Sequence, residues 1–207
     1  RKMKLKVCGM REKENIKALL DLKPAYMGLI FWGGSSRYVS EKTDQLPHTT
    51  KKTGVFVDAT LDYIETTIKE HQLDAVQLHG KESAVYCNLV GEFGVEVIKA
   101  FSVNDPFDFS ILSSYETACD YFLFDTKGPL PGGNGSGFNW ELLANYPSKK
   151  PFFLSGGIGP DDTEKIKQLI KTELPLFAVD VNSKFELSPG NKNIELIKAF
   201  KKQLDEL

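Results

Sequence analysis

The chain has 207 residues, a formal net charge of −2 and 41% hydrophobic residues. This length suffices for one large core and leaves no room for a second, so we expect a single domain over residues 1–207. The charge excludes the strongly basic surface typical of nucleic-acid binding. No apolar stretch approaches the roughly 18 to 20 residues that span a bilayer, so neither nucleic acid nor a membrane is an expected partner.

Cysteine usage indicates the compartment. Cys8, Cys87 and Cys119 are an odd number, lack metal-ligand spacing and fall short of the cysteine density of a secreted disulfide scaffold. The N-terminus also lacks the long apolar core of a signal peptide. We therefore expect a soluble protein of the reducing cytoplasm, with no metal site.

Eight short apolar runs are spaced through the chain. They are residues 5–7, 26–31, 54–57, 75–78, 95–100, 121–124, 152–154 and 177–179. A parallel strand that is covered on both faces has such a continuous run. Segments with helical spacing lie between them or close the chain, at 12–22, 61–70, 162–171 and 194–207, whereas 40–45 and 140–145 could form only one or two turns.

This alternation predicts an α/β fold, the (β/α)8 TIM barrel. A doubly wound dinucleotide fold is disfavoured because no Gly-x-Gly-x-x-Gly turn follows the first run. The runs are followed directly by residues that can do chemistry: Cys8, the loop 32–37 with Trp32, Asp58, His79, Phe101, Asp125, residues 155–157 and Asp180. All strand ends of such a barrel open onto one face, so we expect these residues to converge.

Two loops carry a phosphate signal. Ser155-Gly156-Gly157-Ile158-Gly159 follows the seventh run, and Asp180-Val181-Asn182-Ser183 follows the eighth, ahead of the last helix. Glycines let backbone N–H groups point at an anion, and a helix N-terminus adds a favourable dipole. An isolated Gly-Gly more often serves only a tight turn, but in barrels this pair of loops is the usual phosphate site. A second glycine-rich stretch, 128–137, is either a flexible connector or a mobile lid.

Cys8 and Asp125 are candidates for a proton shuttle. Such a shuttle needs an acceptor and a donor on opposite sides of a substrate, each with a pKa moved toward neutrality. The alternatives are a small buried hydrophobe for Cys8 and a strand-end cap for Asp125, and each is at least as common as the functional role.

Four further residues are candidate binding groups. Arg37 has a planar fork suited to a carboxylate, although an arginine in solvent is the default. His79 at a strand end is more often a hydrogen-bonded structural residue than a catalyst. Gln77 and Asp180 stand beside the strand ends and complete the group.

Eight motifs, in order along the chain, match one family. They are Lys6-Val7-Cys8-Gly9-Met10, Ser35-Ser36-Arg37-Tyr38-Val39, Gly54-Val55-Phe56-Val57, Val76-Gln77-Leu78-His79-Gly80, Phe124-Asp125-Thr126, Gly132-Gly133-Asn134-Gly135, Leu154-Ser155-Gly156-Gly157-Ile158 and Asp180-Val181-Asn182-Ser183. Ser-Gly-Gly occurs in many phosphate-binding barrels, but the ordered set is specific. The chain resembles phosphoribosylanthranilate isomerase.

The resemblance implies an Amadori rearrangement in tryptophan biosynthesis, acting on a small phosphorylated substrate without metal or organic cofactor. It places the general base on Cys8, the general acid on Asp125 and the anthranilate carboxylate on Arg37. Gly156, Gly157 and Ser183 fall in the phosphate loops and Asp180 beside the sugar, and Gln77, His79 and Asn182 complete the expected substrate-binding set. The oligomeric state is expected to be monomer or homodimer.

Two departures from the family pattern stand out. Ser36 replaces a usual proline, which loosens a loop with little expected loss. Lys184-Phe185 follow Asn182-Ser183 where the family usually has a small residue, so bulk could block backbone approach to phosphate, or Lys184 could add its own charge.

Two rival functions remain in view. Indole-glycerol-phosphate synthase chemistry is disfavoured because Cys8 stands where that family wants a lysine. A silent barrel that only binds a phosphorylated metabolite would have no use for both Cys8 and Asp125.

Overall fold

The computed structural model describes residues 2–43, 48–104, 106–126 and 140–207. Eight parallel strands form a closed barrel, in which β1 pairs with both β2 and β8. The strands are β1 (Lys4–Val7), β2 (Tyr26–Ile30), β3 (Lys51–Phe56), β4 (Ala75–Leu78), β5 (Glu96–Ser102), β6 (Tyr121–Asp125), β7 (Phe152–Ser155) and β8 (Leu176–Val181). Each predicted run lies in or overlaps one strand, so the predicted TIM barrel is confirmed.

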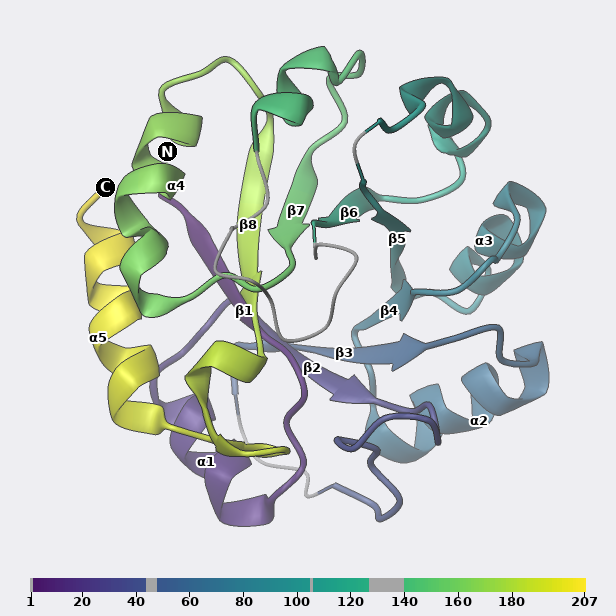
Figure 1. Cartoon of the computed structure of the whole chain (residues 1–207). Helices are drawn as coiled ribbons and strands as arrows, with labels where there is room; N and C mark the ends of the chain where they lie inside the picture. The colour runs from purple at the N-terminus through teal and green to yellow at the C-terminus, as the bar shows by residue number, and fades with distance from the viewer. Residues whose placement is uncertain (1, 44–47, 105, 127–139) are drawn as a thin grey trace.

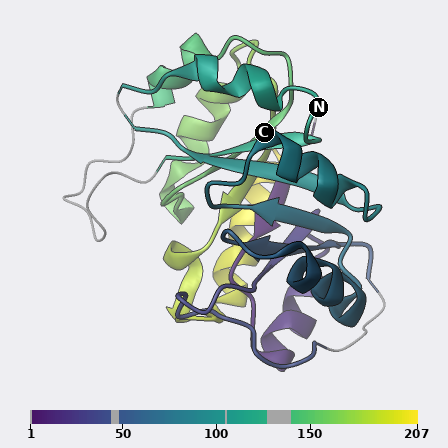
Figure 2. The same cartoon turned by 90° about the vertical axis from the view of Figure 1, so that its right-hand side faces the viewer.

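Helices surround the strands on the outside, as Figures 1 and 2 show. They are α1 (Lys13–Asp21), α2 (Leu61–His71), α3 (Ala84–Gly91), η1 (Phe109–Tyr115), η2 (Trp140–Asn145), η3 (Pro160–Asp162), α4 (Thr163–Ile170) and α5 (Ile194–Asp205). Between β8 and α5 lie a short helix, η4 (Ser183–Phe185), and a hairpin of β9 (Glu186–Ser188) and β10 (Asn191–Lys192). The run pattern does not predict this hairpin.

The two short helical expectations have different outcomes. Residues 40–43 are not helical, and the rest of the expected 40–45 segment lies outside the described residues. The 140–145 segment forms a 3-10 helix. The spacing of apolar residues does not predict the α3 helix, because apolar side chains lie on both its faces: Val85 is exposed, whereas Cys87 and Val90 are buried.

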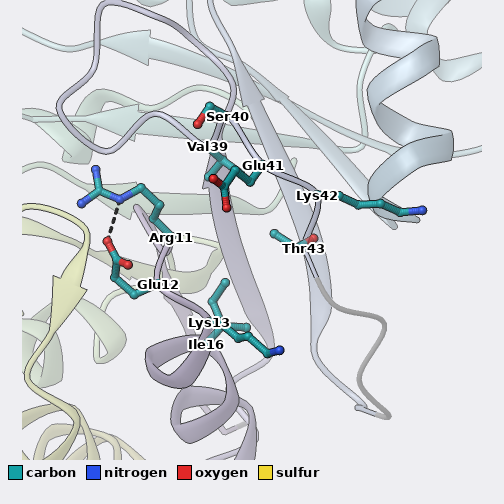
Figure 3. Close-up of a pocket in the computed structure, with 9 residues that line it drawn as sticks. All are labelled: Arg11, Glu12, Lys13, Ile16, Val39, Ser40, Glu41, Lys42 and Thr43. Atoms are coloured by element: carbon teal, nitrogen blue, oxygen red, sulfur yellow. Dashed lines mark hydrogen bonds and ion pairs between the residues drawn. The ribbon is translucent and has the colours of Figure 1, made fainter.

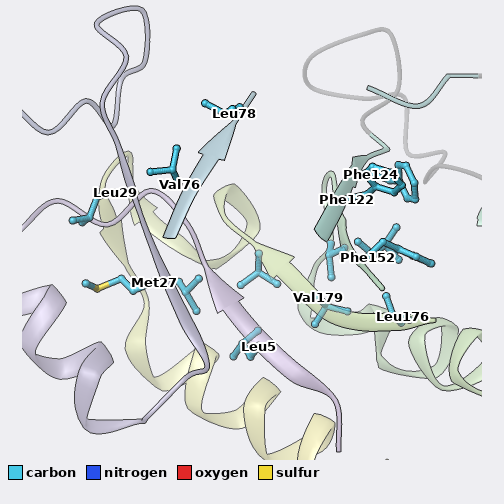
Figure 4. Packing of buried hydrophobic residues seen from close by; sticks show 14 of the residues in the cluster. Leu5, Met27, Leu29, Val76, Leu78, Phe122, Phe124, Phe152, Leu176 and Val179 are labelled. Atoms are coloured by element: carbon cyan, nitrogen blue, oxygen red, sulfur yellow. The ribbon is translucent and has the colours of Figure 1, made fainter. Parts of the chain in front are cut away.

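Alternate residues of each strand face the barrel interior, because successive side chains of a strand point to opposite faces. Outward-facing residues form the layer between strands and helices, which Figure 4 shows in part with Leu5, Met27, Leu29, Val76, Leu78, Phe122, Phe124, Phe152, Leu176 and Val179. Lys6 and Cys8 have the opposite parity to Leu5 and therefore face inward.

Aromatic rings fill the barrel at the amino ends of its strands. The Tyr26 and Phe153 ring centroids are 5.0 Å apart, and those of Tyr121 and Phe177 are 4.4 Å apart. The interior therefore stays open toward the carboxyl ends of the strands, where the loops with polar residues meet. No helix in the described part of the chain is long and apolar enough to cross a membrane.

Candidate active site

A cavity of about 400 Å³ lies at the carboxyl ends of the strands. All ten predicted site residues line it: Cys8, Arg37, Gln77, His79, Asp125, Gly156, Gly157, Asp180, Asn182 and Ser183. They come from β1, β2, β4, β6, β7 and β8 or from the loops that follow these strands. The expected convergence of strand ends is therefore what the structure shows.

Cys8 sits directly after β1 and above a buried ion pair. Its backbone N–H donates to the Val181 carbonyl oxygen at 2.9 Å, which fixes it beside β8. Two residues earlier, the fully buried Lys6 donates from Nζ to Asp180 Oδ1 at 3.0 Å. Ser155 Oγ donates to the other oxygen, Asp180 Oδ2, also at 3.0 Å. Both oxygens of Asp180 are thus held by neighbouring strands.

The expectation of a Cys8 pKa moved toward neutrality is wrong. Burial raises the pKa of the Cys8 thiol above its ordinary value, because a thiolate loses its hydration there. The positive charge of Lys6 opposes this, the carboxylate of Asp180 adds to it, and the charge of Lys192 has a smaller opposing effect. The net direction is upward, so the thiol form dominates at neutral pH.

Gln77, His79 and Asp125 form a chain of polar contacts. Gln77 Nε2 lies 2.8 Å from His79 Nδ1, and His79 Nε2 lies 3.3 Å from Asp125 Oδ2. Gln77 and His79 are two residues apart on and just after β4, so both side chains face inward. Gln77 Oε1 is buried and, within the described residues, makes no hydrogen bond. The buried amide of Gln77 thus contacts the imidazole of His79, which in turn contacts the carboxyl group of Asp125.

Arg37 is held by a residue that sequence reasoning missed, Glu186. Arg37 Nε donates to both Glu186 oxygens at 3.0 and 2.9 Å, and Nη2 donates to Oε1 at 2.5 Å. The loop is fixed locally as well, because the Arg37 N–H donates to Ser35 Oγ at 3.0 Å. Trp32, which is 46% exposed, lines the cavity beside this loop.

The loop after β7 has the backbone that an anion site needs. Gly156 and Gly157 have φ of 106° and 70°, a left-handed region in which a side chain would be strained. A Cβ built on Gly157 would meet no atom within 4 Å, so the loop borders open space on that side. The Asp162 carboxylate accepts the Gly159 N–H at 2.7 Å and fixes the end of the loop.

The unusual Lys184-Phe185 pair does not fill the cavity. Phe185 is fully buried and packs on Phe200 of α5, with ring centroids 4.9 Å apart, so its bulk enters the core. Lys184 is exposed and does not line the cavity. Its stem lies 3.0 Å from the place of a Cβ on Gly159, beside the glycine loop. Of the two alternatives left open by the sequence, the steric block is therefore not present.

A second cavity, of about 490 Å³, lies outside the barrel mouth (Figure 3). Arg11, Glu12, Lys13, Ile16 and residues 39–43 line it, and none of the ten predicted site residues does. The glycine-rich stretch 128–137, expected to be a connector or a lid, lies outside the described residues. Within the described residues, no group of three or more His, Cys, Asp or Glu side chains could hold a metal ion.

Three buried charged residues near the site were not predicted: Lys6, Glu186 and Lys192. Lys6 carried a usable signal, since its place two residues before Cys8 on one strand gives both the same orientation. Glu186 and Lys192 lie on the β9–β10 hairpin, whose two short strands show no run or period to detect. Glu186 pairs with Arg37, 149 positions away in the chain, and this pairing depends on the barrel being closed.

Comparisons with known proteins agree with this site. The family model described as N-(5'phosphoribosyl)anthranilate (PRA) isomerase matches residues 5–203. The chain is 40% identical to N-(5'-phosphoribosyl)anthranilate isomerase of Parabacteroides distasonis, over 98% of this chain and 93% of that one.

Solved structures give the same result. A phosphoribosyl anthranilate isomerase in complex with reduced 1-(o-carboxyphenylamino)-1-deoxyribulose 5-phosphate is similar with a TM-score of 0.84, at 29% identity over 99% of this chain and 100% of that one. The monomers generated from a dimeric enzyme of Thermotoga maritima give a TM-score of 0.82, at 30% identity and the same coverage. The chain belongs to the N-(5'-phosphoribosyl)anthranilate isomerase family.

Proposed function

We propose that Asp125 and Cys8 carry the two proton transfers by which this isomerase converts N-(5-phosphoribosyl)anthranilate to 1-(2-carboxyphenylamino)-1-deoxyribulose 5-phosphate in tryptophan biosynthesis. The observation that carries this proposal is that both groups line one cavity with the glycine loop between them. In the ring of strands, β8 and β7 separate β1, which precedes Cys8, from β6, which ends in Asp125. A phosphate bound over β7 and β8 would place the attached sugar between acid and base.

The proposed chemistry follows from this placement. Asp125 protonates the furanose ring oxygen, so the ring opens to a protonated Schiff base between C1 and the anthranilate nitrogen. Cys8 as thiolate then removes the C2 proton and leaves a neutral enolamine. Tautomerisation moves the hydroxyl proton of C2 to C1 and gives the ketone. One proton has passed from Asp125 to the substrate and one from the substrate to Cys8, so exchange of a proton restores the enzyme.

We propose that Gln77 and His79 position the side chain of Asp125 and do not bind the substrate themselves. If Gln77 donates to Nδ1, then the Nε2–H of His79 donates to Oδ2 of Asp125, and Oδ1 can carry the acid proton. If the amide is turned over, its now unpartnered Oε1 accepts from Nδ1–H, and Nε2 accepts the proton of a protonated Asp125. A general acid requires the first arrangement, because the proton on Asp125 must point at the ring oxygen and not at His79. We therefore assign Gln77 and His79 to positioning the acid, a narrower role than the substrate binding expected from sequence.

The base would depend on its buried lysines. Lys6 beneath Cys8 and Lys192 farther away favour the thiolate, which otherwise loses its hydration on burial. They offset burial only in part, because the pKa stays raised. Cys8 thus reacts from a minor ionised form with the high basicity needed to remove a carbon-bound proton.

The remaining residues would bind the two anionic ends of the substrate. Backbone N–H groups at Gly156, Gly157 and Ser183 hold the phosphate, and Arg37 of the loop after β2 holds the anthranilate carboxylate. Asp180 and Asn182 complete the wall between these ends. Since β2 lies on the far side of β1 from β8, the substrate would extend past Cys8 with C2 near the sulfur.

The direct test is turnover: freshly prepared substrate should lose its anthranilate-adduct fluorescence when the protein is added. A barrel that only binds phosphorylated metabolites would bind the substrate and leave this signal unchanged. Indole-glycerol-phosphate synthase chemistry would instead act on the isomerised compound and form an indole, which absorption distinguishes.

Several expectations from sequence remain predictions. The dimeric relative from Thermotoga maritima supports the homodimer among the two oligomeric states expected, and sedimentation of the purified protein tests it. A cytoplasmic location, one domain over the whole chain and independence from metal ions remain to be measured.

A further inference from the structure

We propose that Glu186 is a positioning residue that turns one edge of the Arg37 guanidinium toward the substrate carboxylate. The inference rests on the proposed role of Arg37 as the carboxylate clamp. It adds a residue on the β9–β10 hairpin to a site otherwise built from the loops directly after the barrel strands.

The guanidinium has two edges that can each take a carboxylate side by side. One is formed by Nε and Nη2, and the other by Nη1 and Nη2. Glu186 occupies the first edge, with Nε at 2.9 and 3.0 Å and Nη2 at 2.5 Å from its oxygens. Among the described residues, Nη1 has no hydrogen-bond partner. Only the second edge therefore stands ready for an incoming carboxylate.

Burial and hydrogen bonds hold the Glu186 side chain in place, so it can support the Arg37 guanidinium. Its side chain is 5% exposed. Oε2 accepts from Lys192 Nζ at 2.8 Å and from the Gly190 N–H at 2.9 Å. Lys192 is fully buried and also donates to Asn182 Oδ1 at 2.9 Å, which ties the hairpin to the end of β8. A surface arginine with a mobile partner would lack this support.

The charges favour binding of an anion. Burial raises the pKa of Glu186, but hydrogen bonds from Arg37, Lys192 and the Gly190 N–H outweigh it and hold that pKa at about 2. Glu186 is therefore ionised at any assay pH. One carboxylate between two cations leaves the cluster with a net positive charge, so it attracts the substrate carboxylate while one edge of Arg37 stays occupied.

A second contact joins the same two segments without touching Arg37. Arg11 Nη1 donates to the Ser36 carbonyl at 2.8 Å, and Nη2 donates to the Pro189 carbonyl at 3.0 Å. The hairpin and the loop after β2 therefore remain tied when the Glu186 contact is removed. This makes Glu186→Gln a test of orientation more than of loop structure.

The experiment compares Glu186→Gln with wild type by calorimetric titration of two ligands. One is the reduced 1-(o-carboxyphenylamino)-1-deoxyribulose 5-phosphate, and the other is the same compound made from aniline, without the carboxylate. We expect the first Kd to rise about tenfold, the effect of losing one charge-assisted contact, and the second to change less than twofold. In turnover, KM should rise while kcat changes little. Glu96→Gln, which removes a paired glutamate at the opposite end of the barrel, is the matched control and should leave both Kd values as they are.

A double-mutant cycle with Arg37→Ala shows whether Glu186 acts through Arg37. In the Arg37→Ala background, Glu186→Gln should add less than twofold to the first Kd. Three outcomes would overturn the proposal. The effects of the two substitutions on the first Kd could be fully additive, or Glu186→Gln could weaken both ligands equally. Glu186→Gln could also bind the first ligand more tightly than wild type, which would mean that Glu186 competes with the substrate.

The proposed clamp can fail separately. If Arg37→Ala alone affects both ligands equally, then Arg37 does not bind the carboxylate, and the fault lies in the proposed function. If Glu186→Gln does not fold, Glu186→Asp keeps the charge and displaces it. The carboxylate-selective loss should then persist, and its absence would reject the positioning role.

Discussion

Gly28 of β2 lies against the sulfur of Cys8. A Cβ built on Gly28 would lie 2.6 Å from Cys8 Sγ and 3.0 Å from Cys8 Cα. Both residues face the barrel interior on neighbouring strands, so a side chain at position 28 and the thiol cannot occupy the same space. The position of the proposed base thus depends on a glycine in the middle of β2, two residues from either end of that strand.

The first prediction follows from this contact. Gly28→Ala should displace the thiol and lower kcat by at least about tenfold, because misplacing a reacting group is costly. Binding of reduced 1-(o-carboxyphenylamino)-1-deoxyribulose 5-phosphate, the reduced product analogue, should change much less. The matched control is Gly91→Ala at the end of α3, where a built Cβ has only Val97 Cγ2 in range, at 3.8 Å. Wild-type kcat in Gly28→Ala would show that the sulfur position is not critical.

The second prediction concerns pH. The active form of the enzyme–substrate complex has an ionised Cys8 and a protonated Asp125. It carries the same total charge as the form in which the proton lies on Cys8 and Asp125 is ionised. The ratio of the two does not change with pH, so kcat/KM should stay level until the thiol of the free enzyme ionises. Since burial raises the pKa of Cys8 above its ordinary value of 9.0, the falling limb should begin above pH 9. A falling limb centred below pH 8.5 would contradict the assignment.

The third prediction concerns the support of the acid. Gln77→Met keeps the volume but removes the partner of His79, so kcat should fall about tenfold, the value of one hydrogen bond to a charged group. The Kd of the reduced product analogue should hold within twofold. In an Asp125→Asn background the same change should cost little further activity. A rise in Kd that matches the loss in kcat would instead restore the substrate-binding role expected from sequence.

Sequence and structure agree where a property is local to a strand. Each of the ten site residues lies in or near a strand end, and eight apolar runs fix which ends converge. The orientation of Lys6 relative to Cys8 also follows from the period of two. What could not be predicted is pairing between segments far apart in the chain, such as Arg37 with Glu186, because no local pattern specifies which distant side chain meets an arginine.

The direction of the Cys8 pKa could not be predicted either. It depends on the balance between burial and the charges of Lys6, Asp180 and Lys192, which only the folded chain defines. The same holds for Lys184-Phe185: in sequence the pair reads as bulk in a phosphate loop, and in the structure Phe185 packs on Phe200 instead.

The fourth prediction concerns the phosphate site. Lys184 is exposed outside the cavity lining, so Lys184→Ala should raise the inhibition constant of inorganic phosphate by at most about fivefold, the effect of an exposed charge. Gly157→Val should abolish inhibition, because φ of 70° disfavours a β-branched residue at the loop. Loss of phosphate inhibition in Lys184→Ala would show that the ammonium, and not the backbone, holds the anion.

The central claim is that Cys8 and Asp125 move protons and do not merely bind. The most direct measurement is the turnover of freshly prepared substrate by Cys8→Ser and Asp125→Asn, alongside calorimetric binding of the reduced product analogue to both. The account predicts that kcat falls by about 10² or more in each variant, since neither alcohol nor amide can exchange a proton as required, while Kd stays within about threefold of wild type. Turnover within tenfold of wild type in either variant, or a loss confined to KM, would contradict it.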